Sequence, residues 1–211
     1  MKICIGIISY FPDTDELRKT RSARLNKLIG RCNDLFNLPI LIVAQNWKSI
    51  VCKADNVKVY YYENKLGITG ARKELRKIFL DSEYDYIIML DDDIQLAGTK
   101  PSADEYIKQI QSNPNGYCTF KALTLQLFAI SKEMFSKFEF PDGEIANGDY
   151  FEDMWLIMAL KKLYPEKHLV FKRGDLNPIG DAVRDKDSTW FHGQFNKHEI
   201  GDRTRAMIKE L

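Results

Sequence analysis

The sequence has few histidines and cysteines, no long apolar run and no excess of either charge. It holds three histidines and four cysteines, and no two cysteines form a C-x-x-C pair, which argues against a structural zinc site. No stretch approaches the ~20 apolar residues of a membrane-spanning helix, so we expect no stable membrane insertion. The 31 basic and 30 acidic side chains give a net charge of +1, which argues against a general nucleic-acid or membrane-surface binder.

The chain also lacks internal repeats, low-complexity tracts and a domain linker. Its 211 residues fit one domain that can bury a sizeable core. The apolar segment 3–11 follows a lysine as a signal core would, but no small-residue cleavage site comes after it, so a buried first strand is favoured. The cysteines are expected to be reduced and mostly buried, as in a cytoplasmic protein. They are Cys4, Cys32, Cys52 and Cys118.

Hydrophobic periodicity in the first half predicts strands that alternate with helices. The predicted elements are strands over residues 3–9, 38–44, 57–62 and 86–90, and helices over 14–32 and from Gly67 onward. This alternation is typical of a parallel sheet with helices on both faces. Right-handed crossovers would bring all the carboxyl ends of the strands to one edge of the sheet, where ligands of such sheets bind.

Shorter elements are expected in the second half. They are a helix to about residue 111 that opens with a Ser102–Glu105 capping box, one or two strands over 117–130, a short helix capped by Ser131, an apolar helix over 151–163 and a last strand over 167–171. Residues 172–190 are polar and rich in turn formers, so they are a candidate mobile lid. The predicted fold class is therefore α/β, with a mostly parallel central sheet flanked by helices and a small antiparallel element in the second half.

The acidic run Asp91-Asp92-Asp93 is the sharpest feature, because it follows directly on a buried strand. Three adjacent carboxylates repel one another, so their charge must be offset. Mg²⁺ or Mn²⁺ would do this, since these ions bind one or two carboxylates together with phosphate oxygens. A solvated acidic turn at a strand end is the alternative.

Three blocks of sequence resemble the GT-A glycosyltransferases, and they are most similar to family 2. Residues 64–72 (NKLGITGAR) resemble the family's N-x-G-x-x-x-A-R-N block, and Asp91 and Asp93 take the outer places of its D-x-D motif. Residues 127–135, followed by the acidic pair at 152–153, resemble the strand, short helix and Glu-Asp pair of the family's second half.

The chain departs from the family pattern at two places. Lys73 stands where the first block usually ends in asparagine. The Glu-Asp pair is followed by Met154-Trp155-Leu156, without the family's further aspartate and arginine. These differences leave the acceptor and part of the base assignment open.

The resemblance implies a single Rossmann-like GT-A domain and a metal-dependent hexosyl- or related transferase. Its parts would be a nucleotide-binding half (1–95), an acceptor half (96–171), and a lid with a C-terminal tail (172–211). The donor would be a nucleotide sugar, a UDP-sugar first of all, used with Mn²⁺ or Mg²⁺. Acceptors of this fold include sugars, proteins, lipids and modified nucleic-acid bases, and the sequence does not choose among them.

The resemblance also implies a metal site formed by Asp91, Asp93 and His192. Asp93 would contact the metal directly, whereas Asp91 would face the donor ribose or a metal-bound water. Asp92, like Asp91, would be a donor-binding residue. His192 looks like the histidine after the lid that ligates the metal in several GT-A enzymes. A histidine packed between aromatic neighbours is the alternative.

Four more residues are candidates for contact with the donor. The loop after the first strand places Ser9 and Tyr10 near the nucleoside, where the tyrosine ring would stack on the base or belong to the core instead. Lys65 and Arg72 would lie near the phosphates or order the aspartates, and a solvated helix face is the alternative for both.

An acceptor hydroxyl needs a general base. Asp153 occupies the family's base position, and Glu152 would orient it or contact the acceptor. The alternative is a plain role at the start of a helix, where the dipole favours carboxylates. Direct displacement by this base predicts inversion at the anomeric carbon, and a retaining transferase stays open.

Two other functions are weighed against the transferase. A nucleotidyltransferase that makes nucleotide sugars would need a glycine-rich loop after the first strand, and residues 9–13 (SYFPD) contain no glycine. A non-catalytic nucleotide-sugar-binding module is disfavoured because the acids at 91, 93, 152 and 153 are all present.

Overall fold

The structure is a computed structural model. It describes residues 1–11, 15–50, 54–119, 127–140, 151–171, 176–180, 205, 206, 208 and 209, with the backbone alone for residues 16, 17, 151–154 and 177–180. Within this part of the chain, no helix is long and apolar enough to cross a bilayer. The cytoplasmic location stays a prediction.

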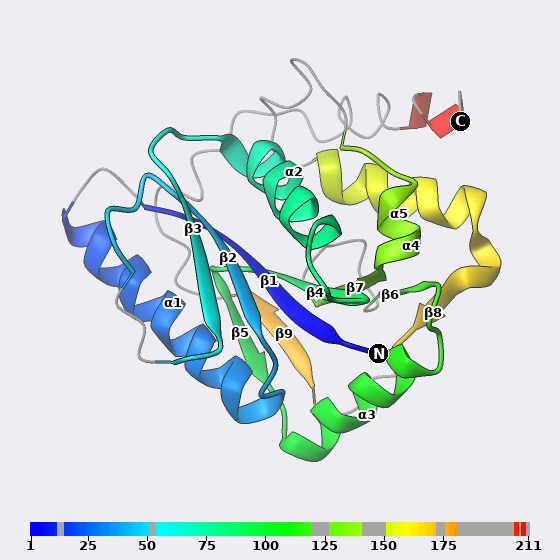
Figure 1. Ribbon diagram of the computed structural model, residues 1–211, viewed down its shortest axis with the longest axis horizontal. Helices are drawn as coiled ribbons and strands as arrows, with labels where there is room; N and C mark the ends of the chain where they lie inside the picture. Colours follow the sequence, from blue (N-terminus) through cyan, green and yellow to red (C-terminus); the bar gives the residue numbers. More distant parts are fainter. Residues whose placement is uncertain are drawn as a thin grey trace.

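A seven-stranded sheet forms the centre of the molecule, with strand order β3-β2-β1-β4-β7-β6-β8 (Figure 1). Only β7 runs antiparallel to its neighbours, so the sheet is mostly parallel with a small antiparallel part in the second half, as predicted. The strands are β1 (Ile3–Tyr10), β2 (Ile40–Gln45), β3 (Val57–Tyr62), β4 (Tyr86–Asp91), β6 (Tyr117–Thr119), β7 (Phe128–Ser131) and β8 (His168–Val170).

Helices cover both faces of the sheet because its central strands are apolar on both sides; β2, for example, is buried along its whole length. The helices are α1 (Asp15–Leu35), α2 (Gly67–Leu80), α3 (Lys100–Gln111), α4 (Lys132–Ser136) and α5 (Phe151–Leu163), and a 3₁₀ turn, η2, spans Pro165–Lys167. One core cluster joins α1 and α3 to the sheet, and the other joins α2, α4 and α5 to the opposite face.

The predicted elements are confirmed with small shifts at their ends. Of the one or two strands expected over 117–130, the structure has two, β6 and β7. Ser131 caps α4, since its Oγ accepts from the backbone N–H of Met134 at 3.2 Å. Because β4 pairs directly with β7, the two predicted halves share one sheet. The division of function between them stays a prediction.

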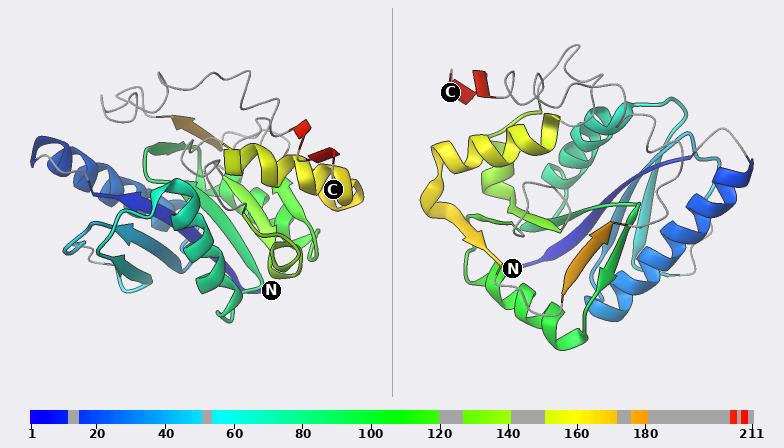
Figure 2. Two further views of the ribbon diagram at one scale, coloured as in Figure 1. Left: turned by 90° about the horizontal axis from the view of Figure 1, so that it is seen from above. Right: turned by 180° about the vertical axis from the view of Figure 1, so that it is seen from behind.

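Two expectations about local structure need correction. The capping box at Ser102 is wrong, because Thr99 is the N-cap of α3 and its side chain accepts from the backbone N–H of Ser102. Part of the expected lid is a strand, β9 (Asn177–Gly180). It pairs antiparallel with β5 (Ile94–Ala97), and β5 directly follows the acidic run in the sequence. Seen from behind, this pair lies beside α1 (Figure 2). The rest of the expected lid lies outside the described residues.

Three of the four cysteines are free and buried, and Cys52 lies outside the described residues. Cys4 and Cys32 are fully buried on opposite faces of the sheet, and Cys118 lies within β6. Burial raises the pKa of Cys32 and of Cys118 to about 12 each, and it raises that of Cys4 as well. These thiols have a structural role as small core residues.

Candidate active site

The carboxyl ends of β1, β2 and β4 meet at one edge of the sheet. Tyr10 pairs with Gln45 across β1 and β2, and Ile8 pairs with Asp91 across β1 and β4. The loop after β1 and the acidic run after β4 are therefore neighbours, as the predicted topology requires.

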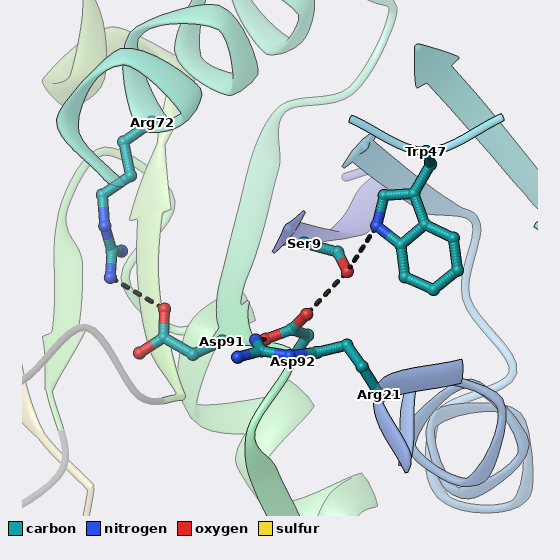
Figure 3. Close-up of polar contacts among 6 residues, drawn as sticks. All are labelled: Ser9, Arg21, Trp47, Arg72, Asp91 and Asp92. Atoms are coloured by element: carbon teal, nitrogen blue, oxygen red, sulfur yellow. Dashed lines mark hydrogen bonds and ion pairs between the residues drawn. The ribbon is translucent and has the colours of Figure 1, made fainter. Parts of the chain in front are cut away.

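Asp91 is the last residue of β4 and Asp92 follows it in a turn, and their side chains point toward opposite faces of the sheet (Figure 3). Asp91 faces α2, and its Oδ1 accepts from Nη2 of Arg72 at 2.8 Å. Asp92 faces α1, and its Oδ1 accepts from Nη1 of Arg21 at 2.6 Å. The Asp91 side chain keeps 22% of its surface exposed, whereas that of Asp92 keeps 6%. Adjacent carboxylates thus have different access to a ligand.

Asp92 belongs to a buried hydrogen-bond network that includes Ser9 and Trp47 (Figure 3). Its Oδ2 accepts from Oγ of Ser9 at 2.6 Å, and Nε1 of Trp47 donates to the same Ser9 Oγ at 3.2 Å. Only 2% of Ser9 is exposed. These contacts lie within the protein, so the contacts of Ser9 and Asp92 with a donor stay predictions, and the geometry favours a supporting role for both.

Arg72 lies in the second turn of α2 with 3% of its side chain exposed. Of the two roles expected for it, ordering the aspartates is the one that its contact with Asp91 supports. A buried guanidinium that holds one oxygen of Asp91 fixes the direction of that carboxylate.

Tyr10 and Lys65 come together at the same edge. The Lys65 ammonium lies 4.9 Å from the centroid of the Tyr10 ring, within the range of a cation–π contact. Gln45 holds the segment that carries the lysine, because its Oε1 accepts from the backbone N–H of Leu66 at 2.8 Å. On the other side of the edge, the Phe11 ring packs on Trp47 with centroids 4.2 Å apart. Tyr10, Phe11 and Lys65 therefore add aromatic rings and a further positive charge to the edge that carries the two arginine–aspartate pairs.

The predicted metal site is only partly described. Among the described residues, no group of three or more His, Cys, Asp or Glu side chains is placed to hold a metal ion. His192 lies outside the described residues. Asp91 and Asp93 offer two carboxylates at one rigid strand end, which fits Mg²⁺ or Mn²⁺ when substrate phosphates and waters complete the coordination. The described residues thus offer part of the coordination of an ion shared with a diphosphate, and the metal site itself stays a prediction.

Comparison with known proteins identifies the fold. No protein-family model and no curated protein matches the chain. A structure of Staphylococcus aureus TarS in complex with UDP-GlcNAc matches with a TM-score of 0.66 at 12% identity, over 99% of this chain and 65% of that one. The fold is GT-A-like.

Two further solved structures also match this chain at low sequence identity. Another TarS structure gives a TM-score of 0.61 at 12% identity, over 99% of this chain and 43% of that one. CMP:2-keto-3-deoxy-manno-octonic acid synthetase complexed with CTP gives 0.53 at 10% identity, over the full length of both chains. The chain thus spans 43% to 65% of these two TarS structures. At such identities the likeness shows the GT-A-like fold alone.

The predicted base residues are placed only by their backbone. Glu152 and Asp153 stand in the first turn of α5, as predicted, and their side chains lie outside the described part of the chain. The following turns pack this helix into the core on the α2 face, through Leu156, Ile157 and Leu160. The GT-A-like fold therefore anchors the helix, and the catalytic role of its first turn stays a prediction.

The sequence reasoning missed Arg21, Gln45 and Trp47. Arg21 had a visible signal, because it continues the stripe of Leu25, Leu28 and Cys32 toward the start of α1, and an arginine on an apolar stripe needs a buried partner. Gln45 and Trp47 had none, since their contacts are with distant segments of the GT-A-like fold.

Proposed function

We propose that this protein is a metal-dependent glycosyltransferase that moves a sugar from a nucleoside-diphosphate sugar to a hydroxyl acceptor. The observation that carries the proposal is the acidic end of β4, set beside the ends of β1 and β2 at the ligand-binding edge of a GT-A-like sheet. TarS, solved with UDP-GlcNAc, supports a nucleotide-sugar donor, and a UDP-sugar is the first candidate.

Asp91 and Asp93 would hold the cation, and His192 is proposed as a third ligand. When bound, Mn²⁺ or Mg²⁺ stabilises the negative charge that develops on the leaving diphosphate. Arg72 keeps Asp91 oriented through their 2.8 Å bond. Tyr10 offers an aromatic face for the base, and Lys65 beside it offers a positive charge for the donor.

Transfer itself is assigned to the first turn of α5. The acceptor oxygen attacks the anomeric carbon, its proton passes to the carboxylate of Asp153, and the bond from that carbon to the diphosphate oxygen breaks. Glu152 orients the base or the acceptor. This single displacement inverts the anomeric configuration. The predicted lid within residues 172–190, with Trp190 at its end, is proposed to close over the donor and exclude water.

The second candidate is a nucleotidyltransferase, favoured by the full-length match to the CTP-bound synthetase. Such an enzyme joins a nucleoside triphosphate to a sugar or sugar phosphate and releases pyrophosphate. The loop after β1 argues against this function, because it contains none of the glycines that such an enzyme needs there. Release of pyrophosphate from any nucleoside triphosphate and sugar phosphate would establish this alternative.

The proposal is tested with a thermal-shift panel of UDP-, GDP-, ADP- and CMP-sugars, each with and without Mn²⁺. A ligand that binds only the folded state raises the Tm by mass action. We expect one class of nucleotide sugar to raise the Tm only with metal, and slow hydrolysis of that donor to release free nucleoside diphosphate. A panel without any metal-dependent shift, and without donor hydrolysis, would refute the proposal.

A further inference from the structure

Two arginines from opposite faces of the sheet reach the same strand end. Arg72 comes from α2 and binds Asp91, whereas Arg21 comes from α1 and binds Asp92 (Figure 3). The two pairs differ in exposure, because Asp91 stays partly open to solvent and Asp92 is almost fully enclosed. The Asp92 carboxylate is therefore much less accessible to a ligand than that of Asp91.

The Asp92 carboxylate connects four segments of the chain. Its two oxygens bind α1 through Arg21 and the end of β1 through Ser9, and Ser9 in turn binds Trp47 in the segment after β2. All these groups are at least four-fifths buried. A network of short hydrogen bonds between buried charged groups fixes relative positions more strictly than apolar contact does.

The positions that this network fixes are those of the residues next to it. Ser9 immediately precedes Tyr10, and Asp92 stands between Asp91 and Asp93. Because Arg21 offsets the charge of Asp92, the pair adds no net charge to the strand end. The network thus positions the flanking residues without adding charge to the strand end.

We propose that Arg21 and Asp92 are positioning residues that set Tyr10, Asp91 and Asp93 in the geometry that the metal-bound nucleotide requires. This inference rests on the proposed function. Residues behind the ligands of a metal site typically change metal affinity or activity by about 10- to 100-fold when they are replaced. The network assigns this role to an arginine on α1, a helix that contributes no residue to the predicted metal or donor site.

Isothermal titration of UDP in the presence of Mn²⁺, with CDP, GDP and ADP titrated in parallel, tests the inference. The variants are Arg21→Gln and the nearly isosteric Asp92→Asn, measured well below the Tm of the least stable one after circular dichroism has shown that they are folded. We expect each to weaken the binding of the preferred diphosphate by about 10- to 100-fold. Arg21→Lys, which keeps the charge, should recover part of the loss.

Arg31→Gln is the matched control. Arg31 also lies on α1 and docks this helix on the sheet, because its Nε donates to the Leu96 carbonyl at 3.0 Å and its Nη2 donates to the Gly98 carbonyl. Its replacement should lower the Tm and leave the diphosphate affinity unchanged. The double variant Arg21→Gln/Asp92→Asn should bind no more weakly than the worse single variant, because the two residues act as a unit.

The outcomes separate the inference from the proposed function. A wild-type protein that binds none of the four diphosphates with Mn²⁺ refutes the proposed function, and the positioning role fails with it. A wild-type protein that binds one of them, with Arg21→Gln and Asp92→Asn binding it equally well, refutes the positioning role alone. An equal loss in Arg31→Gln would also refute it, since the effect would then come from the docking of α1.

Discussion

The two arms of the central sheet are built differently although they are joined through the pairing of β4 with β7. In the parallel arm, β3-β2-β1-β4, strands of six to eight residues end in polar side chains such as Gln45 and Asp91. In the other arm, β7-β6-β8, the strands have three or four residues, and aromatic rings fill the space around them; Tyr117 stacks on His168 with centroids 4.8 Å apart. The comparison teaches that polar side chains gather where the long strands end together, while aromatic packing surrounds the short strands.

The largest effect expected in the short arm is on stability. Phe135 on α4 is fully buried, and its ring lies near Phe79 and Phe140. Phe135→Ala should reduce the free energy of unfolding by about 3–5 kcal/mol, because it removes apolar contact and leaves a cavity. Urea unfolding measures this loss. Leu163→Ala, at a position that is 39% exposed, is the control and should change stability by less than about 0.5 kcal/mol. If Phe135→Ala weakened nucleotide binding at low temperature, the contrast between the arms would fail.

The parallel arm should show the opposite pattern at its acidic end. Asp91→Asn should reduce kcat/KM for the donor by about 10²–10³-fold, since a charge that stabilises the transition state through the cation is lost. The amide keeps an oxygen that can accept from Arg72, so stability should fall less than in Phe135→Ala. Asp85→Asn is the control at the amino end of the same strand, where Asp85 accepts from the backbone N–H of Lys2 at 2.7 Å. Equal activity losses in both variants would mean that the strand, and not its carboxyl end, matters for turnover.

A smaller effect tests the helix that packs with α1 against the sheet. Thr99→Ala should cost about 1 kcal/mol of stability, because it removes the N-cap of α3. Glu105→Ala should cost almost nothing, since Glu105 is exposed and its hydrogen bond, to Gln109, is formed within the helix. Thermal unfolding of both variants decides between the Thr99 cap and a Ser102–Glu105 capping box. A larger loss in Glu105→Ala would restore the capping box.

The smallest effect is a pH dependence of stability in the short arm. Burial, and then the charge of Lys161, lower the pKa of His168 below its usual 6.5. The unfolded chain thus binds a proton more readily than the folded one, so stability is full above about pH 6.5 and falls as the pH drops through this value toward the lower folded pKa. His168→Gln should flatten this part of a Tm profile from pH 7.5 to 5.0. An unchanged profile would show that His168 is not the titrating group.

The sequence predicted the long elements and missed the features that depend on distant partners. The apolar runs of β1 and β2 identify strands by themselves, and the alternation of strands with helices places their ends at one edge. By contrast, the opposite directions of Asp91 and Asp92 were not predicted, because Asp92 lies in the turn after β4 and its direction depends on contacts with β1 and α1. In addition, β5 and β9 are four-residue strands far apart in the chain, and neither contains a pattern that predicts the other. The Trp47–Ser9 bond likewise depends on tertiary packing.

The buried thiols make this protein suitable for site-specific labelling. Thiolates react with maleimides, and Cys4, Cys32 and Cys118 are enclosed in the fold with raised pKa values. While the chain is folded, these three positions should stay unmodified at neutral pH. After replacement of Cys52, a fluorophore attached to one cysteine introduced near the carboxyl edge of the sheet would report directly on donor binding.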